Sequence, residues 1–265
     1  MDALLLKSVR WTLVAGIFAF IIYRNRATLD RVGFGREISL VVFAYFAYFA
    51  VRGVTQGAEA QALINADRVV AFERKLGILW EPAWQAAILP HPLLVDFFNW
   101  IYVWGHWPVI ITVATWLFMS RPDLYRLYRN AFLFSGAIGL VIFATFPVAP
   151  PRLAGDIEVI DTVTLHSNSY RVLQPPGLVN QYAAVPSLHF GWNMLLGIAI
   201  VTAARSRWVK LVGAVIPPIM FLAIVLTANH YIIDAVAGAA VAGVGLWLAW
   251  SGARDGPSGQ YADAY

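Results

Sequence analysis

Two histidines and one aspartate lie near the starts of two apolar segments and are suited to proton or group transfer. His189 lies in AAVPSLHFGWN at 183–193, three residues after Pro186, and proline favours the first turn of a helix. His230 lies in LTANHYIIDAVAG, and Asp234 follows it by four residues, a spacing that shares one helix face. A carboxylate there accepts a hydrogen bond from one ring nitrogen of His230 and leaves the other as a nucleophile or base.

The composition indicates an integral membrane protein. Of the 265 residues, 60% are hydrophobic and 13% are charged, whereas soluble domains carry about 25% charged residues. A soluble core cannot hide this much apolar surface. The absence of cysteine excludes disulfides, thiol catalysis and thiolate metal sites. The net charge of +4 does not indicate a nucleic-acid partner, because the basic residues lie in short loops between apolar segments.

Seven apolar segments approach the length of about 20 residues that a membrane span needs. They lie at 4–23, 37–54, 93–118, 131–148, 187–204, 208–228 and 230–250. We therefore predict an all-α, polytopic integral membrane helical bundle of six core spans with an additional N-terminal span. The segment at 4–23 is the weakest, because Lys7 and Arg10 interrupt it, and whether it crosses fully is left open.

The spans and the segments between them predict four regions. These are N-terminal spans over 1–54, an interfacial or re-entrant helical segment over 55–92, a catalytic helical core over 93–250 and a solvated tail over 251–265. The second region mixes charged residues with apolar positions at helical spacing, which is typical of a helix lying in the membrane interface. Within the core, the proline-rich stretch 149–186 is predicted to be the one long loop between spans.

The basic residues predict the orientation in the membrane. They concentrate in the loops at 24–36, 119–130 and 204–210, which alternate onto one side. Short basic loops tend to stay in the cytoplasm. We therefore expect a multi-pass plasma membrane protein with its C-terminus in the cytoplasm and with His189, His230 and the long loop on the extracytoplasmic face.

The motifs around these residues resemble a known family. P-S-L-H at 186–189, followed 41 residues after His189 by H-Y-x-x-D at 230–234 and then Gly238, resembles the type 2 phosphatidic acid phosphatase (PAP2) superfamily. The similarity is closest to the branch that contains inositol phosphorylceramide synthase. FPVAPPR at 146–152 and NWIYVWGHW at 99–107 are also similar to that branch. The resemblance covers roughly residues 65–250.

The resemblance implies a role for each site residue. His230 would be the nucleophile that attacks phosphorus and forms a phosphohistidine, and Asp234 would orient it. His189 would protonate the departing oxygen and then act as a base for the incoming water or alcohol. Ser187 and the backbone amides near it would hold phosphate oxygens. The implied mechanism needs no metal and no cofactor.

The chain departs from the ordinary phosphatases of the superfamily in its cationic positions. Their first motif, K-x6-R-P, is absent, and the Ser-Arg that precedes their nucleophile is replaced by Ala223 and Ile224. Leu188 stands where their P-S-G-H has glycine. These departures favour the transferase-like branch. Arg152, just past a span end, is our candidate for offsetting phosphate charge, and Arg171 is a weaker second.

Further polar residues are candidates for a substrate pocket. Asn99, Tyr102 and His106 fall at 0, +3 and +7 in the segment 93–118 and are expected to share one face. Residues at that spacing either line a headgroup pocket or form interhelical hydrogen bonds, which is their commoner use in membranes. Tyr231 either contacts substrate or anchors at the interface.

The favoured function is transfer or hydrolysis of (substituted) phosphoryl groups of lipid-linked phosphates through a phosphohistidine, with an inositol phosphorylceramide synthase-like phosphotransferase preferred. The expected partner is a phospholipid or polyprenyl-phosphate substrate. One alternative is a plain phosphatase acting on phosphatidic acid or polyprenyl phosphate. Others are a proton-coupled transporter, an intramembrane serine hydrolase using Ser187, and a zinc site of the two histidines and the aspartate. The lipid, the acceptor and the oligomeric state are left open.

Overall fold

The computed structural model describes residues 33–55, 59–155, 157–166 and 181–254. Within these ranges every regular element is a helix, and the only β-type pairing is an isolated parallel bridge between Val148 and Ala183. The all-α prediction is therefore confirmed. The predicted segment at 4–23, Arg171 and residues 255–265 of the predicted tail lie outside the described residues.

The chain divides into two compact units, residues 1–45 and 46–265. Helix α3 (Phe34–Thr55) begins in the first unit and corresponds to the predicted segment at 37–54. The second unit contains all the site residues. Its elements are α4 (Glu59–Leu76), α5 (Glu81–Ile88), α6 (Pro92–Trp104), α7 (Trp107–Ser120), α8 (Pro122–Thr145), the 3₁₀ turn η1 (Pro151–Leu153), α9 (Thr162–His166), α11 (Leu188–Ala203), α12 (Arg207–Leu226) and α13 (Ile232–Arg254).

Several of these helices are suited to a bilayer. By length and composition, α8, α12 and α13 can each cross a membrane, and α6 with α7 makes a fourth crossing if the bent pair is one span. Helix α11 is apolar but has 16 residues, fewer than the about 20 that a perpendicular span needs. The chain is a helical membrane protein, and the count of six core spans plus one stays a prediction.

The predicted span at 93–118 is not one straight helix. It consists of two helices bent by 48° relative to each other, with the break at Gly105 and His106. Pro108 lies in the first turn of α7 and has no N–H to donate to the preceding turn, which favours a break or kink at this point. The predicted span at 131–148 also differs, because its helix α8 begins earlier, at Pro122.

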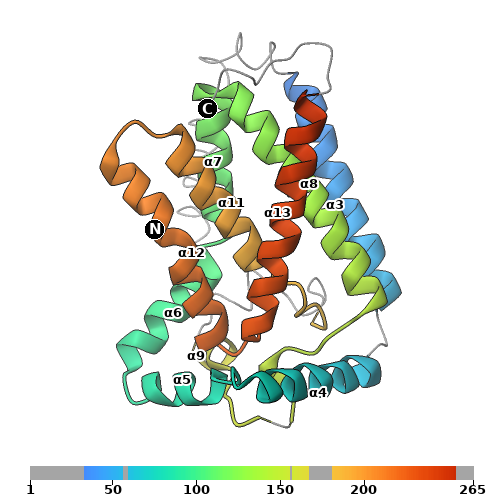
Figure 1. Cartoon of the computed structure of the whole chain (residues 1–265), viewed down its shortest axis with the longest axis vertical. Helices are drawn as coiled ribbons and strands as arrows, with labels where there is room; N and C mark the ends of the chain where they lie inside the picture. The colour runs from blue at the N-terminus through green and yellow to red at the C-terminus, as the bar shows by residue number, and fades with distance from the viewer. Residues whose placement is uncertain (1–32, 56–58, 156, 167–180, 255–265) are drawn as a thin grey trace, which may run out of the picture. The chain divides into compact units, whose positions relative to one another are not determined.

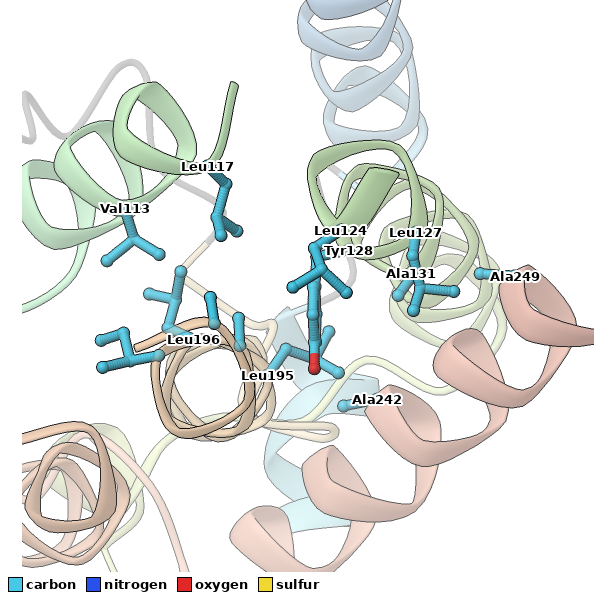
Figure 2. Close-up of a cluster of buried hydrophobic side chains, with 13 residues drawn as sticks. Val113, Leu117, Leu124, Leu127, Tyr128, Ala131, Leu195, Leu196, Ala242 and Ala249 are labelled. Atoms are coloured by element: carbon cyan, nitrogen blue, oxygen red, sulfur yellow. The ribbon is translucent and has the colours of Figure 1, made fainter. Parts of the chain in front are cut away.

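Helix α11 is packed among four neighbours, α7, α8, α12 and α13. Figure 2 shows a cluster of buried apolar side chains between α11 and the helices α7, α8 and α13. Leu195 and Leu196 of α11 are almost fully buried in it. Helices α4 and α5 lie across one end of the bundle, near the connection between α12 and α13 (Figure 1).

Helices α11 and α13 touch through their backbones near their N-terminal ends. A Cβ added at Gly191 of α11 would lie 2.5 Å from the carbonyl oxygen of Gly238 in α13. A Cβ added at Gly238 would overlap the carbonyl oxygen of Ser187. The Ser187 N–H also donates to the backbone oxygen of Asp234 (3.0 Å). These contacts place the start of α11, with His189, directly against the start of α13.

Gly238→Ala is expected to destabilise the protein, because its methyl group meets rigid backbone. Overpacking of this kind costs about 1–3 kcal/mol. Gly243→Ala is the matched control on the same helix, since an added Cβ there has nothing within 4 Å. The control should unfold at the same temperature or higher. Thermal unfolding in detergent, followed by tryptophan fluorescence, measures both, and equal midpoints for the two variants would contradict the close contact.

Candidate active site

The connection between α12 and α13 carries His230. Helix α12 ends in a Schellman motif, in which the Ala228 N–H donates to Val225 O (2.9 Å) and the Asn229 N–H donates to Ile224 O (3.1 Å). Ala228 accordingly has a left-handed backbone with φ of +56°, where glycine is usual. This conformation costs a residue that has a Cβ about 1–2 kcal/mol. The surrounding packing and hydrogen bonds therefore have to hold the connection in this shape.

His230 is held by a carboxylate and a backbone carbonyl. Its Nδ1 lies 3.2 Å from Asp234 Oδ2 and 2.8 Å from the oxygen of Ala184. Because both partners are acceptors, the hydrogen is on Nδ1 and the lone pair is on Nε2. Asp234 Oδ2 also accepts the Tyr231 N–H (2.9 Å). The carboxylate therefore orients the ring from the first turn of α13, although the helix begins two residues after His230 and not at it.

His189 lies in the first turn of α11, where Ser187 is the N-cap. Ser187 Oγ accepts the Phe190 N–H (3.3 Å), which stabilises the helix start. The His189 ring is stacked on two other rings, Tyr102 with centroids 4.8 Å apart and His106 with centroids 4.1 Å apart. The stacking restricts the orientation of the His189 side chain.

The two site histidines are neighbours. The centroids of the His189 and His230 rings are 5.9 Å apart. His189 Nε2 is buried, and no group among the described residues bonds to it. A group bound beside both rings would meet the lone pair of His230 Nε2 and the His189 Nε2, to which no described residue bonds. This arrangement suits a nucleophile and a proton donor acting on one atom.

His106 belongs to a buried polar pair. Its Nδ1 lies 3.2 Å from Asn193 Nδ2, which also donates to the backbone oxygen of His189 (2.8 Å). The Trp192 ring lies nearly parallel to His106, with centroids 5.8 Å apart. Residues from α11 and from the break between α6 and α7 thus fix one another around His189.

Asn99, Tyr102 and His106, which were predicted to share one face, do not all contact the same group. Tyr102 and His106 contact His189, whereas Asn99 bonds reciprocally with Thr162 of α9. The Thr162 Oγ1 donates to Asn99 Oδ1 (2.8 Å), and Asn99 Nδ2 donates to Thr162 O (3.1 Å). Asn99 therefore anchors α9 to α6 in this structure.

Arg152 of η1 is fixed beside the His230 connection. Its Nη1 donates to Asn229 Oδ1 (2.6 Å), its Nε lies 3.4 Å from Asp161 Oδ2, and its backbone N–H donates to Ala228 O (3.0 Å). Its charge acts on both site histidines. Arg152 thus brings a guanidinium to the side of the site, a group suited to phosphate oxygens.

The positions that depart from the superfamily motifs are packed with apolar groups. Ala223 and Ile224, which replace the Ser-Arg pair, are fully buried in a hydrophobic cluster. Leu188, which replaces glycine, packs on α8, where a Cβ added at Gly139 would lie 3.1 Å from its methyl groups. The missing arginine is therefore not replaced from α12, and the guanidinium of Arg152 reaches the site from η1.

The remaining predicted residues have other placements. Tyr231 is fully buried in a hydrophobic cluster, and its hydroxyl donates to Ala149 O (3.2 Å), so it is packed as a core residue. Ser187 is also fully buried, and Arg171 lies outside the described residues. No three His, Asp or Glu side chains within the described ranges are arranged as a metal site.

Sequence reasoning missed three buried polar side chains of α4 and α5. Glu73, Glu81 and Gln85 are almost fully buried, and each bonds to backbone at the end of α12 or the start of α13. A signal for Glu73 was present, because it falls on the buried face of α4. That face is formed by Ala62, Asn65, Ala66, Val69, Val70 and Glu73.

Comparisons with known proteins agree with these motifs. A family model described as the PAP2 superfamily matches residues 67–248, which is more than half of the chain. The chain belongs to the PAP2 superfamily. The resemblance to this superfamily that the motifs predicted is thereby confirmed.

One similar protein is phosphoinositol dihydroceramide synthase of Bacteroides thetaiotaomicron, which is 28% identical over 211 residues. The match covers 72% of this chain and 66% of that protein, so the chain spans slightly less than two thirds of the relative. The crystal structure of Aquifex aeolicus LpxE matches 61% of this chain and 87% of its own, with a TM-score of 0.47 and 15% identity.

Arg152→Gln is expected to lower kcat/KM on a lipid phosphate, because it removes the cation beside the site histidines while retaining a group that bonds Asn229. Removal of one preorganised electrostatic contact typically lowers kcat by about 10²–10³-fold. Arg121→Gln, at an ion pair that is more than a third exposed, is the control and should keep its activity. Steady-state assays in detergent measure both. Full activity of Arg152→Gln would mean that another group offsets the phosphate charge.

Proposed function

We propose that this enzyme transfers a substituted phosphoryl group from a phospholipid to an alcohol acceptor, in a reaction like that of inositol phosphorylceramide synthase. The observation that carries the proposal is the His230 geometry: Nδ1 is held by Asp234 and Ala184, which leaves Nε2 to attack phosphorus beside His189 Nε2, to which none of the described residues bonds. The similarity to the Bacteroides relative, a phosphoinositol dihydroceramide synthase, supports this choice of reaction.

The reaction has two balanced steps. His230 Nε2 attacks phosphorus, the bond from phosphorus to the diacylglycerol oxygen breaks, and protonated His189 gives its proton to that oxygen. His230 then carries the substituted phosphoryl group, and Asp234 balances the positive charge of the ring. In the second step His189 takes the proton of the acceptor hydroxyl, whose oxygen attacks phosphorus and releases His230. Arg152 stabilises the charge that develops on the phosphoryl oxygens in both steps.

The side of the membrane follows from the basic loops. With the loops at 24–36, 119–130 and 204–210 in the cytoplasm, the site opens to the extracytoplasmic face of the plasma membrane. Substrates would then come from the outer leaflet. A reporter fused after Tyr265 should read as cytoplasmic, and an external reading would reverse this orientation.

The substrate assay uses purified protein in detergent with EDTA. Phosphatidylinositol, phosphatidic acid and a polyprenyl phosphate are each supplied with and without ceramide or diacylglycerol, and free phosphate and lipid products are followed together. Acceptor-dependent transfer without free phosphate supports the proposal. Release of phosphate from phosphatidic acid or polyprenyl phosphate without an acceptor would instead assign a phosphatase.

The histidine roles are tested with an activated phosphate ester, whose leaving group needs no proton. His230→Ala should show no turnover on any substrate. His189→Ala should lower the rate on the lipid by about 10²–10⁴-fold. It should still react once with the activated ester and accumulate an acid-labile phosphoenzyme. His91→Ala, at an exposed histidine, should behave as wild type. Full turnover by His230→Ala would exclude the phosphohistidine.

A further inference from the structure

The first turn of α13 is held by carboxyl groups from three different elements. Asp234 Oδ2 accepts the Tyr231 N–H (2.9 Å), Glu81 Oε1 of α5 accepts the Ile232 N–H (2.8 Å), and Glu73 Oε1 of α4 accepts the Ile233 N–H (2.7 Å). All three carboxyl side chains are fully buried. Three consecutive N–H groups that a helix start leaves unpaired are thus satisfied by acids.

The other end of the connection is held from α5 as well. Gln85 Nε2 donates to Leu226 O (3.0 Å) at the end of α12 and to Ile160 O (2.8 Å). Side chains of α4 and α5 therefore form hydrogen bonds at both ends of the Thr227–Tyr231 connection. His230 lies between these two anchoring points, so its position depends on them.

Three buried negative charges this close would repel strongly, and a helix N-terminus supplies only about half a positive charge. The second oxygens, Glu73 Oε2 and Glu81 Oε2, are buried and have no donor among the described residues. One proton shared between the two carboxyl groups provides a hydrogen bond and removes one charge. Burial, together with this hydrogen bond to Glu81, raises the pKa of Glu73 to about 9, so the proton is retained at neutral pH.

We propose that Glu73 and Glu81 form a proton-sharing carboxyl pair that positions the His230 connection and leaves Asp234 as the carboxylate that pairs with His230. Neither glutamate touches the reacting atoms, so both are positioning residues. The catalytic part of this inference rests on the proposed function, whereas the shared proton does not. The titratable groups around the pair are Asp234 and Tyr231 at the start of α13, with Asp67 on α4 acting on Tyr231.

Thermal unfolding against pH tests the shared proton without any activity. In the folded wild type Glu73 keeps a proton that the unfolded chain releases above pH 4.5. The stability of the wild type should therefore fall as pH rises from 4.5 to about 9. Glu73→Gln has an amide that cannot lose this proton. Its unfolding temperature relative to wild type should therefore increase steadily across that window. Asp67→Asn, at an exposed carboxylate on the same helix, is the control, and its unfolding temperature should differ from that of wild type by the same amount at every pH. A pH-independent difference between Glu73→Gln and wild type would overturn the shared proton.

Kinetics tests the positioning role. Glu73→Leu should lower kcat per folded molecule by about 10- to 100-fold with little change in KM, and Glu73→Gln should recover most of the loss. Above pH 9 the wild type should lose activity as the pair ionises, and Glu73→Gln should not. A purely structural role would lower the folded fraction of both variants while leaving kcat per folded molecule unchanged, which would refute positioning.

A spectroscopic measurement separates this inference from the proposed function. In protein with ¹⁵N-labelled histidine, the His230 resonances, identified from their loss in His230→Asn, should shift in Glu73→Leu and return towards wild type in Glu73→Gln. This outcome supports positioning even if no lipid is turned over, in which case only the proposed function fails. Unshifted His230 resonances in Glu73→Leu would refute positioning even in an active enzyme.

Discussion

The N–H groups at the start of α13 are buried, and in these surroundings each must find an acceptor. Leaving one unsatisfied costs about 1–3 kcal/mol. The chain meets this demand with side chains from Glu73 and Glu81 on two other helices and from Asp234. Helices α4 and α5 therefore help to hold the connection that carries His230, so the end of the bundle that they cover contributes to the site.

A second constraint brings the other half of the site to this point. The backbones of α11 and α13 touch at Gly191 and Gly238, and the Ser187 N–H donates to Asp234 O. Because Ser187 is the N-cap of α11, the same contact places His189 in the first turn beside His230. Two helix starts thus converge, and the partial positive charge at each favours an anion such as phosphate.

The surroundings of this pair divide into an aromatic side and a cationic side. Tyr102 and His106 stack on His189, and Asn193 links His106 to the backbone of His189. On the other side, Arg152 bonds Asn229, the residue before His230. Ala223 and Ile224 stand where ordinary members of the superfamily carry Ser-Arg ahead of their nucleophile. The guanidinium of Arg152 on η1 is the cation that we propose for the phosphate charge.

The sequence by itself determined the features that depend on short spacings. Apolar length and period predicted the helices, the four-residue spacing predicted the pairing of His230 with Asp234, and Pro186 marked the helix start where Ser187 is the N-cap. Only the tertiary structure decided which distant groups meet there. Glu73 reaches Ile233 across 160 residues and Arg152 reaches Asn229 across 77, and no local pattern encodes such contacts. The break between α6 and α7 was not predicted, although Gly105 and Pro108 lie there. Its effect on His106 depended on α11, because a buried ring takes its orientation from the neighbours that pack against it.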